Sequence, residues 1–468
     1  MKKLLYFLLP LASVLVMHGC SDDQPVTPPI SFGTNADVSG AAGDEIKLNT
    51  VNFVANYDNM EFVINGKAFT EVSRSGDATN TGEGVVYLKI PFKAGSGTIQ
   101  IKTKDGRTID GPKLTYIPQY FTEGMGGPSD IGLSLAQHNA GAMTWDYEAK
   151  ALYTLTAKGM EINTNNTIDL PVVFTKTVLT LPDAANATAN LLQMGGMAVT
   201  DDNHVLFANI YQGTAATGFV NMPQIMLAMP EERLDATYAT GGSPRTDLGT
   251  YVTSIATDHG GENIYYAQAE NTAISKLGSF GTAKPVVVAG SANTGHVDGQ
   301  GAAAKFENIT GLVYDKAAGK LYVADQHCIR EVTADGKVTT LAGSTVSGDA
   351  DGSLAEARFK DIGALALAED GKLYVADNGN QKVKVIDKGR TTVSTLRGAT
   401  SASASDKSHQ FTVDKNGVIY GLSVGTNYGT YFSISLPESM VGEKEYARME
   451  ALKKISMGGD QTVVLKAK

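Results

Sequence analysis

Two stretches of similar sequence decide the fold: "FENITGLVYDKAAGKLYVAD" (residues 306–325) and "FKDIGALALAEDGKLYVAD" (359–377). They differ in length by one residue. In addition, "VAGS" at 288–291 recurs 53 residues later as "LAGS" at 341–344. A repeat of this period is typical of solenoids and propellers, in which each unit buries its apolar surface against the next unit.

The same unit recurs across residues 118–468. A pair of one aliphatic and one aromatic residue follows a turn six times: Leu152-Tyr153, Leu206-Phe207, Ile264-Tyr265, Leu321-Tyr322, Leu373-Tyr374 and Ile419-Tyr420. Successive pairs are 46 to 58 residues apart, which is near the span of a four-stranded blade, and no long helical pattern lies between them. We therefore predict a six-bladed β-propeller, with these aromatic rings packed between its sheets.

Residues 30–117 follow a different pattern. "FVINGKAF" (62–69), "GVVYLKIPF" (84–92) and "GTIQIKTKDG" (97–106) alternate apolar and polar residues between Gly and Asp turns, which predicts a small β-sandwich. Together with "GDEIKLNTVNF" (43–53) and "KLTYI" (113–117), their order resembles the IPT/TIG immunoglobulin-like domain. The resemblance implies a spacer or contact module without catalytic residues. The predicted fold class is all-β.

The start of the chain has the features of a targeting signal. Lys2 and Lys3 precede an apolar run over 4–17, which is too short for a membrane span, and Gly19-Cys20 follows. Residues 1–19 resemble a bacterial lipoprotein signal peptide, which implies that Cys20 carries the lipid. An ordinary secretory peptide cut elsewhere is the alternative.

Residues 20–29, "CSDDQPVTPP", predict a short acidic and proline-rich tether. The acidic start resembles the export tag of Bacteroidota surface lipoproteins, which implies an outer-membrane protein that faces the cell exterior and is held to the membrane by Cys20.

Charge narrows the range of partners. Without residues 1–19 the chain keeps 37 basic against 49 acidic residues, a net charge of −12. A nucleic acid is therefore not an expected partner. With Cys20 acylated only Cys328 remains, so no intramolecular disulfide is expected.

Two of the repeated units resemble NHL repeats: "LYVADQHCIREV" (321–332) and "LYVADNGNQKVKVI" (373–386). The inserts that run from Asp298-Gly299 to Phe306 and from Asp351-Gly352 to Phe359 are similar to those that precede NHL blades. A propeller of this type behind an IPT/TIG domain resembles surface lipoproteins of Bacteroidota that are associated with polysaccharide utilization.

The blade pattern also predicts a site. Loops after the second strand of each blade are expected to ring one mouth of the propeller. They carry the candidate ligand-binding residues Tyr211, Gln268, Glu270, Asp325, His327, Asp377, Asn378 and Tyr428. The inserts are expected to bring His296, Asp298 and Asp351 to the same face. Tyr rings can stack on sugars while amides and carboxylates bind hydroxyls, although aspartates at such positions also cap their own loops.

No pattern of catalytic residues, of metal ligands or of a cofactor site is recognisable, so none is expected. We predict a non-catalytic surface protein that binds a glycan as part of a polysaccharide-uptake system. Two alternatives stay open. One is a protein-interaction platform for an outer-membrane transporter. The other is a metal-dependent lactonase-like or lyase-like propeller enzyme, for which His296, His327, Glu270 and Asp325 would have to converge.

The end of the chain predicts how the ring closes. Tyr446, Met449, Leu452 and Ile455 have helical spacing, which fits a short helix or an outer pair of strands. "TVVLK" (462–466) is expected to form a strand that completes the first blade and removes an exposed edge.

Overall fold

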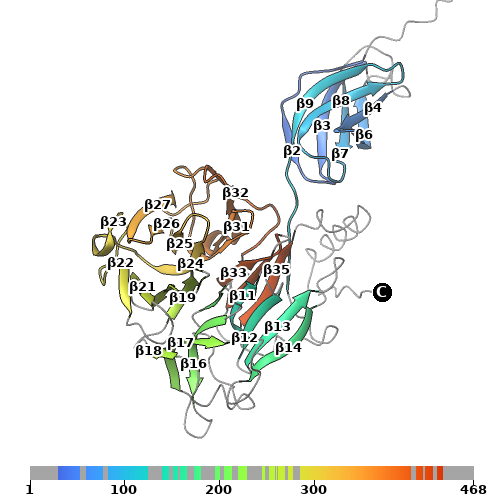
Figure 1. The fold of residues 1–468 in the computed structure, drawn as a ribbon. Helices are drawn as coiled ribbons and strands as arrows, with labels where there is room; N and C mark the ends of the chain where they lie inside the picture. The colour runs from blue at the N-terminus through green and yellow to red at the C-terminus, as the bar shows by residue number, and fades with distance from the viewer. Residues whose placement is uncertain are drawn as a thin grey trace, which may run out of the picture. The chain divides into compact units, whose positions relative to one another are not determined.

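A computed structural model describes residues 30–52, 60–76, 83–124, 140–146, 151–156, 159–165, 173–180, 196–200, 205–212, 220–228, 245–247, 252–258, 260, 262–268, 272–277, 285–401, 407–414, 417–424 and 429–435. The chain divides into two compact units between Pro118 and Gln119. We name them the sandwich unit and the ring unit and describe each by itself (Figure 1). Cys20, the predicted tether and the segment 436–468 lie outside the described residues.

The sandwich unit contains two sheets. The first has the order β1-β3-β7-β6 and consists of β1 (Ser31–Phe32), β3 (Glu45–Val51), β7 (Glu83–Lys89) and β6 (Thr70–Gly76). The second has the order β2-β9-β8-β4-β5 and consists of β2 (Val38–Gly40), β9 (Thr108–Tyr116), β8 (Gly97–Thr103), β4 (Met60–Ile64) and β5 (Lys67–Ala68). All pairings are antiparallel except that of β2 with β9.

The core of this unit lies between its two sheets. In β7 the buried residues Val86 and Leu88 alternate with residues that are more exposed, as expected for a strand with one face in a core. They pack in one cluster with Leu48 of β3 and with Ile99 and Ile101 of β8. Residues of both sheets thus share one core, which makes the unit a β-sandwich.

The ring unit contains six antiparallel sheets, which we number as blades 1–6. Blade 1 consists of β11 (Ala140–Asp146), β12 (Ala151–Thr156), β13 (Gly159–Asn165) and β14 (Val173–Thr180). Blade 2 consists of β15 (Met197–Val199), β16 (Val205–Gln212), β17 (Val220–Ala228) and β18 (Arg245–Asp247). Blade 3 consists of β19 (Val252–Thr257), β20 (Ile264–Gln268), β21 (Ala273–Leu277) and β22 (Val286–Gly290).

The remaining blades each include a strand from outside the simple four-strand meander. Blade 4 consists of β24 (Ile309–Asp315), β25 (Lys320–Asp325), β26 (Cys328–Thr333), β27 (Lys337–Gly343) and the added β23 (Gly299–Gln300). Blade 5 consists of β29 (Ile362–Leu367), β30 (Leu373–Asp377), β31 (Lys382–Ile386), β32 (Thr392–Thr395) and the added β28 (Gly352–Ser353). Blade 6 consists of β33 (Lys407–Val413), β34 (Ile419–Val424), β35 (Gly429–Ser435) and β10 (Phe121–Gly124). Two single-turn 3₁₀ helices, η6 (Gly301–Ala303) and η7 (Asn378–Asn380), lie in loops.

The first strands of the blades form the inner wall of a ring. In chain order, β11 contacts β15, β15 contacts β19, β19 contacts β24, β24 contacts β29, and β29 contacts β33. The last of them, β33, contacts β11 and so completes the circle. The predicted propeller is thus confirmed as a propeller-like, nearly all-β arrangement of several sheets (Figure 1).

A strand from the start of the ring unit completes blade 6. β10 pairs with β35 antiparallel, with Phe121 opposite Ser435, and so forms the outer strand of this blade. Blade 1, which residues 462–466 were expected to complete, has four strands among the described residues, and 462–466 lie outside them. The pairing joins the start of the unit to its last described strand and covers an edge of β35.

The repeated "LYVAD" sequence is buried because neighbouring blades cover both faces of its strand. All five residues of β30 are buried, and so are Leu321 to Asp325 of β25. The repeated rings Tyr265, Tyr322, Tyr374 and Tyr420 are 2–4 % exposed, which confirms for these four positions that the aromatic residues pack in the core. Their burial between sheets, not a ligand, accounts for their recurrence.

Candidate functional site

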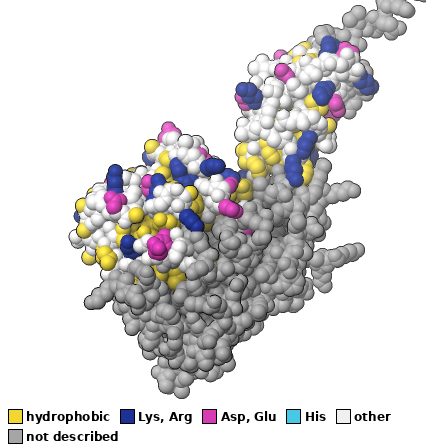
Figure 2. All heavy atoms as spheres, viewed as in Figure 1, with side chains coloured by type: hydrophobic (Ala, Val, Ile, Leu, Met, Phe, Trp, Pro, Cys, Tyr) yellow, Lys and Arg dark blue, Asp and Glu magenta, His cyan; other side chains and the backbone are white. Residues whose placement is uncertain are grey.

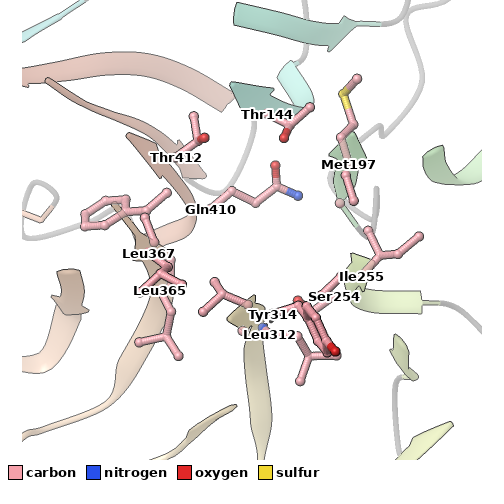
Figure 3. A pocket seen from close by; sticks show the side chains of 18 of the residues that line it. Thr144, Met197, Ser254, Ile255, Leu312, Tyr314, Leu365, Leu367, Gln410 and Thr412 are labelled. Atoms are coloured by element: carbon pink, nitrogen blue, oxygen red, sulfur yellow. Dashed lines mark hydrogen bonds between the residues drawn. The ribbon is translucent and has the colours of Figure 1, made fainter. Parts of the chain in front are cut away.

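A cavity of about 250 Å³ lies in the ring unit, lined by the inner strands of all six blades or by residues that flank them. Its wall includes Met143 and Thr144 of β11, Gly196 to Thr200 at β15, Ser254 to Thr257 of β19, Gly311 to Tyr314 of β24, Ala364 to Leu367 of β29 and Gln410 to Val413 of β33. Figure 3 shows these strands arranged around it. We name it the axial cavity.

The axial cavity has a neutral wall. Among the described residues that line it, none carries a charge. Polar groups come from Thr144, Ser254, Thr257, Tyr314, Gln410 and Thr412, and lie next to aliphatic side chains such as Leu312 and Leu365 (Figure 3). A wall of this kind can bind an uncharged molecule through hydrogen bonds and apolar contact together.

Hydrogen bonds between inner strands hold the wall in place. The Gln410 Oε1 atom of blade 6 accepts a hydrogen bond from the Met143 backbone N–H of blade 1, at 2.7 Å. Ser254 Oγ of blade 3 accepts one from the Leu312 N–H of blade 4, at 2.9 Å. These side chains therefore join neighbouring blades as well as line the cavity.

Gln410 is fixed so that its amide nitrogen is available to the cavity. A backbone N–H can only donate, so the atom that faces Met143 must be the amide oxygen. Nε2 then points into the open space (Figure 3). Gly196 borders this nitrogen, and a Cβ atom at that position would lie 3.1 Å from Nε2, so a glycine leaves room for the amide.

One polar group of the wall lacks a partner. The Thr257 Oγ1 atom is buried and forms no hydrogen bond with the described residues, and the side chain is 4 % exposed overall. An unsatisfied buried hydroxyl costs on the order of 1–3 kcal/mol, and this atom lies out of reach of a molecule in the cavity because it has almost no accessible surface.

Of the residues predicted for the loop mouth, those that the structure describes do not line this cavity. Asp325 is fully buried, and its Oδ1 atom accepts the N–H groups of Glu307 and Asn308, at 2.8 and 3.0 Å. Its Oδ2 atom pairs with Arg330 Nη1 at 2.8 Å and lies 3.2 Å from His296 Nδ1. This aspartate thus holds the segment that leads into β24 and forms a buried ion pair.

Asp377 ends β30 in blade 5, the position that Asp325 has in β25 of blade 4. It is fully buried, and its Oδ1 atom accepts the Lys360 N–H at 2.8 Å while Oδ2 accepts Asn380 Nδ2 at 2.8 Å. Burial raises the pKa of this carboxyl to about 6. The carboxylate oxygens of Asp325 and Asp377 thus bind groups of the chain itself.

Two other predicted residues meet across neighbouring blades. His327 Nδ1 accepts the Asp361 backbone N–H at 3.2 Å, and the Asn378 N–H donates to the Asp361 carbonyl at 3.1 Å. Both side chains are partly exposed. Gln268, at the end of β20, is partly exposed as well. Glu270, Tyr428 and the side chain of Tyr211 lie outside the described residues.

The inserts lie against the loops that follow β25 and β30, since His296 Nδ1 is 3.2 Å from Asp325 Oδ2 and the Asn380 amide donates to the Gly348 carbonyl at 2.8 Å. Gly299 pairs with Val338 of β27, and Gly352 pairs with Val393 of β32, so each insert adds a strand to the outer edge of its blade. Asp298 and Asp351 consequently bind groups of their own blades. Asp298 Oδ1 accepts Arg330 Nη2 at 2.6 Å, and Asp351 Oδ1 accepts Lys384 Nζ at 2.8 Å.

The described residues contain no group of three or more His, Cys, Asp or Glu side chains arranged to hold a metal ion. Within the same part of the chain, the search for a helix long and apolar enough to cross a membrane found none. On the face in view in Figure 2, acidic and basic side chains are interspersed over the described surface.

Sequence reasoning missed the axial cavity because it searched loops. The lining residues belong to the inner strands, where Gln410 and Ser254 interrupt stretches that are otherwise apolar or small. Polar residues at inward positions of several first strands are the signal that would have pointed to the cavity.

Comparisons with known proteins support the repeat assignment for part of the chain. No protein-family model matches the chain. NHL repeat-containing protein 2 from Homo sapiens is 38 % identical over 107 residues, and the protein of that name from Gallus gallus is 30 % identical over 145 residues. These matches cover 22 % and 29 % of this chain but only 15 % and 20 % of those proteins. The chain thus spans about a fifth or less of these relatives.

Solved structures give more distant matches. An auxiliary nutrient binding protein from Bacteroides ovatus is 16 % identical with a TM-score of 0.43, covering 87 % of this chain and 98 % of that chain. An inactive variant of virginiamycin B lyase from Staphylococcus aureus is 10 % identical with a TM-score of 0.40, covering 68 % of this chain and all of that one. The sequence matches thus make part of the chain similar to NHL repeat proteins.

Proposed function

We propose that this chain is a non-catalytic binding protein that takes up a glycan in the axial cavity of a six-bladed, NHL-type β-propeller. The observation that carries the proposal is the neutral wall, to which all six blades contribute. Hydroxyl and amide groups next to apolar surface suit the hydroxyls and the C–H faces of a sugar.

The proposal includes a place of action. Cys20 carries a lipid that anchors the protein to the outer membrane, with the propeller toward the cell exterior. The sandwich unit, whose strand order in sequence resembles an IPT/TIG domain, acts as a spacer between anchor and propeller. In this position the protein serves a polysaccharide-uptake system by holding glycans for a transporter complex in the same membrane.

The test is binding to a panel of plant, host and microbial polysaccharides. The full chain is purified in neutral detergent and run through gels that contain one polysaccharide each, with its metal content measured on the same sample. We expect retardation by one class of polysaccharide and no cleavage of it. The absence of retardation by every polysaccharide would reject glycan binding.

The same experiment separates the two alternatives. Turnover of a substrate that stops when a chelator is added would support a metal-dependent lactonase-like or lyase-like enzyme instead. Co-purification with an outer-membrane transporter, without any glycan binding, would support a protein-interaction platform.

A further inference from the structure

We infer that the axial cavity binds a single uncharged sugar unit at the end of a glycan, and that the Gln410 amide nitrogen is the donor that recognises it. This inference rests on the proposed function, because it concerns the same cavity, and it adds the charge, the size and the orientation of the ligand.

The uncharged wall of the cavity predicts an uncharged ligand. An ionised group that leaves water without a partner loses far more free energy than a neutral group, and the described wall offers no side chain of opposite charge. Uronic acids and sulfated sugars are therefore excluded from the cavity.

The volume of the cavity limits the size of the ligand. The cavity, at about 250 Å³, lies below the range of roughly 300–1,000 Å³ that is typical of pockets for drug-sized ligands. It is large enough for several water molecules, at about 30 Å³ each, and so for one sugar ring. Because inner strands of all six blades surround it, a glycan chain would enter with its terminal unit.

The recognition follows from one polar group of the wall. Gln410 Oε1 is committed to the Met143 N–H at 2.7 Å, which fixes the amide and leaves Nε2 with two hydrogens toward the cavity (Figure 3). A sugar hydroxyl can accept a hydrogen bond from this amide.

Gln410→Glu tests the donor. The glutamate keeps an oxygen for the Met143 N–H and replaces the amide nitrogen by a second acceptor with a negative charge. Gln381→Glu is the matched control, because Gln381 is exposed and does not line the cavity. Binding is measured by isothermal titration calorimetry on the full chain in detergent, with glucose, galactose and mannose, their neutral trisaccharides, and trigalacturonic acid as probes.

We expect at least one neutral trisaccharide to bind, its monosaccharide to bind within tenfold of it, and trigalacturonic acid not to bind. Gln410→Glu should weaken the neutral sugar at least tenfold, while Gln381→Glu should change its affinity less than twofold. Thr257→Val is a second control. It should change the affinity less than twofold without lowering the melting temperature, because the hydroxyl that it removes is buried away from the cavity and has no partner among the described residues.

Several results would overturn the inference. Trigalacturonic acid that binds as tightly as the neutral trisaccharides would refute the charge argument. Affinity that appears only with the trisaccharides would refute binding of a single terminal unit. Unchanged binding in Gln410→Glu, but loss in Tyr211→Ala or Tyr428→Ala, would place the ligand at the loops and leave glycan binding by the protein standing. Failure of every probe and every polysaccharide would reject both.

Discussion

Arg330 and Lys384 occupy equivalent places in blades 4 and 5, and each binds the aspartate of the insert that precedes its blade. Arg330 Nη2 lies 2.6 Å from Asp298 Oδ1, and Lys384 Nζ lies 2.8 Å from Asp351 Oδ1. Both cations are fully buried. Each is also near the ring of the phenylalanine that ends the insert, Phe306 at 5.4 Å and Phe359 at 5.9 Å.

Replacing Arg330 by methionine should lower the free energy of unfolding. Arg330 also pairs with the fully buried Asp325 at 2.8 Å, and removing one partner of a buried pair leaves the other charge without compensation. The expected loss in free energy of unfolding is about 3–5 kcal/mol, measured from urea denaturation followed by circular dichroism. The control is Lys372→Met, whose partner Asp370 is half exposed, and which should cost about 1 kcal/mol or less. Equal losses in the two variants would contradict a structural role for the buried pair.

Asp377 should make the protein less stable as the pH rises from about 4 to about 6. Burial raises its folded-state pKa to about 6, above the ordinary value of 3.8, so the folded protein holds this proton where the unfolded chain has lost it. Its stabilising contribution is complete below pH 4 and disappears as the pH passes 6. The expected size is about 2–3 kcal/mol, because a tenfold difference in proton affinity between the folded and the unfolded chain corresponds to about 1.4 kcal/mol.

The measurement is urea denaturation at pH 4, 5, 6 and 7, on the native chain and on Asp377→Asn. The asparagine does not titrate, so the decline between pH 4 and pH 6 should shrink in that variant. The same decline in both proteins would mean that another group is responsible.

Lys384→Arg should remove this pH dependence by a different route. Among the described residues, Lys384 pairs with Asp349 at 3.0 Å and with Asp351, whereas Arg330 spans the insert aspartate and the loop aspartate together. A guanidinium at position 384 has the fork needed to reach Asp377 as well as Asp351. We expect the free energy of unfolding to become nearly constant between pH 4 and pH 6. Lys382→Arg is the control, because Lys382 is partly exposed and pairs with Asp349. A similar loss of pH dependence in that variant would contradict pairing of a guanidinium at position 384 with Asp377.

Gly343, in the repeated "LAGS", should tolerate no side chain. Its φ angle is +87°, and a Cβ atom there would lie 2.3 Å from the His327 carbonyl oxygen. Gly343→Ala should cost more than about 2 kcal/mol, because strain and a backbone clash add together. Gly319 also has a positive φ, +66°, but a Cβ atom there would contact nothing, so Gly319→Ala should cost about 1 kcal/mol. Similar melting temperatures for the two variants would contradict the clash.

The sequence predicted the sheets better than the contacts between them. The spacing of Tyr322 and Tyr374 indicated two equivalent blades, because a ring buried between sheets must recur at one strand position. The course of the inserts could not be read in the same way. Whether Asp298 faces a mouth or a buried arginine depends on where Gly299 pairs, and that pairing is with Val338 of β27, far along the chain. The cavity escaped notice for a related reason, since Gln410 and Met143 are 267 residues apart.

Cys20, which lies outside the described residues, should carry the lipid that holds the protein in the outer membrane. Cys20→Ser removes the thiol to which the lipid would be attached, so the variant should lose the incorporation of labelled fatty acid and leave the membrane fraction. Cys328→Ser is the control, because this thiol is buried in β26, and burial raises its pKa to about 11, so it is not available for acylation. That variant should stay in the membrane fraction with full labelling.

Protease applied to whole cells should degrade the anchored protein if it faces the exterior, and protection from the protease would place it on the inner side of the outer membrane. Membrane retention of Cys20→Ser with unchanged labelling would show that the acyl chain is attached at another residue.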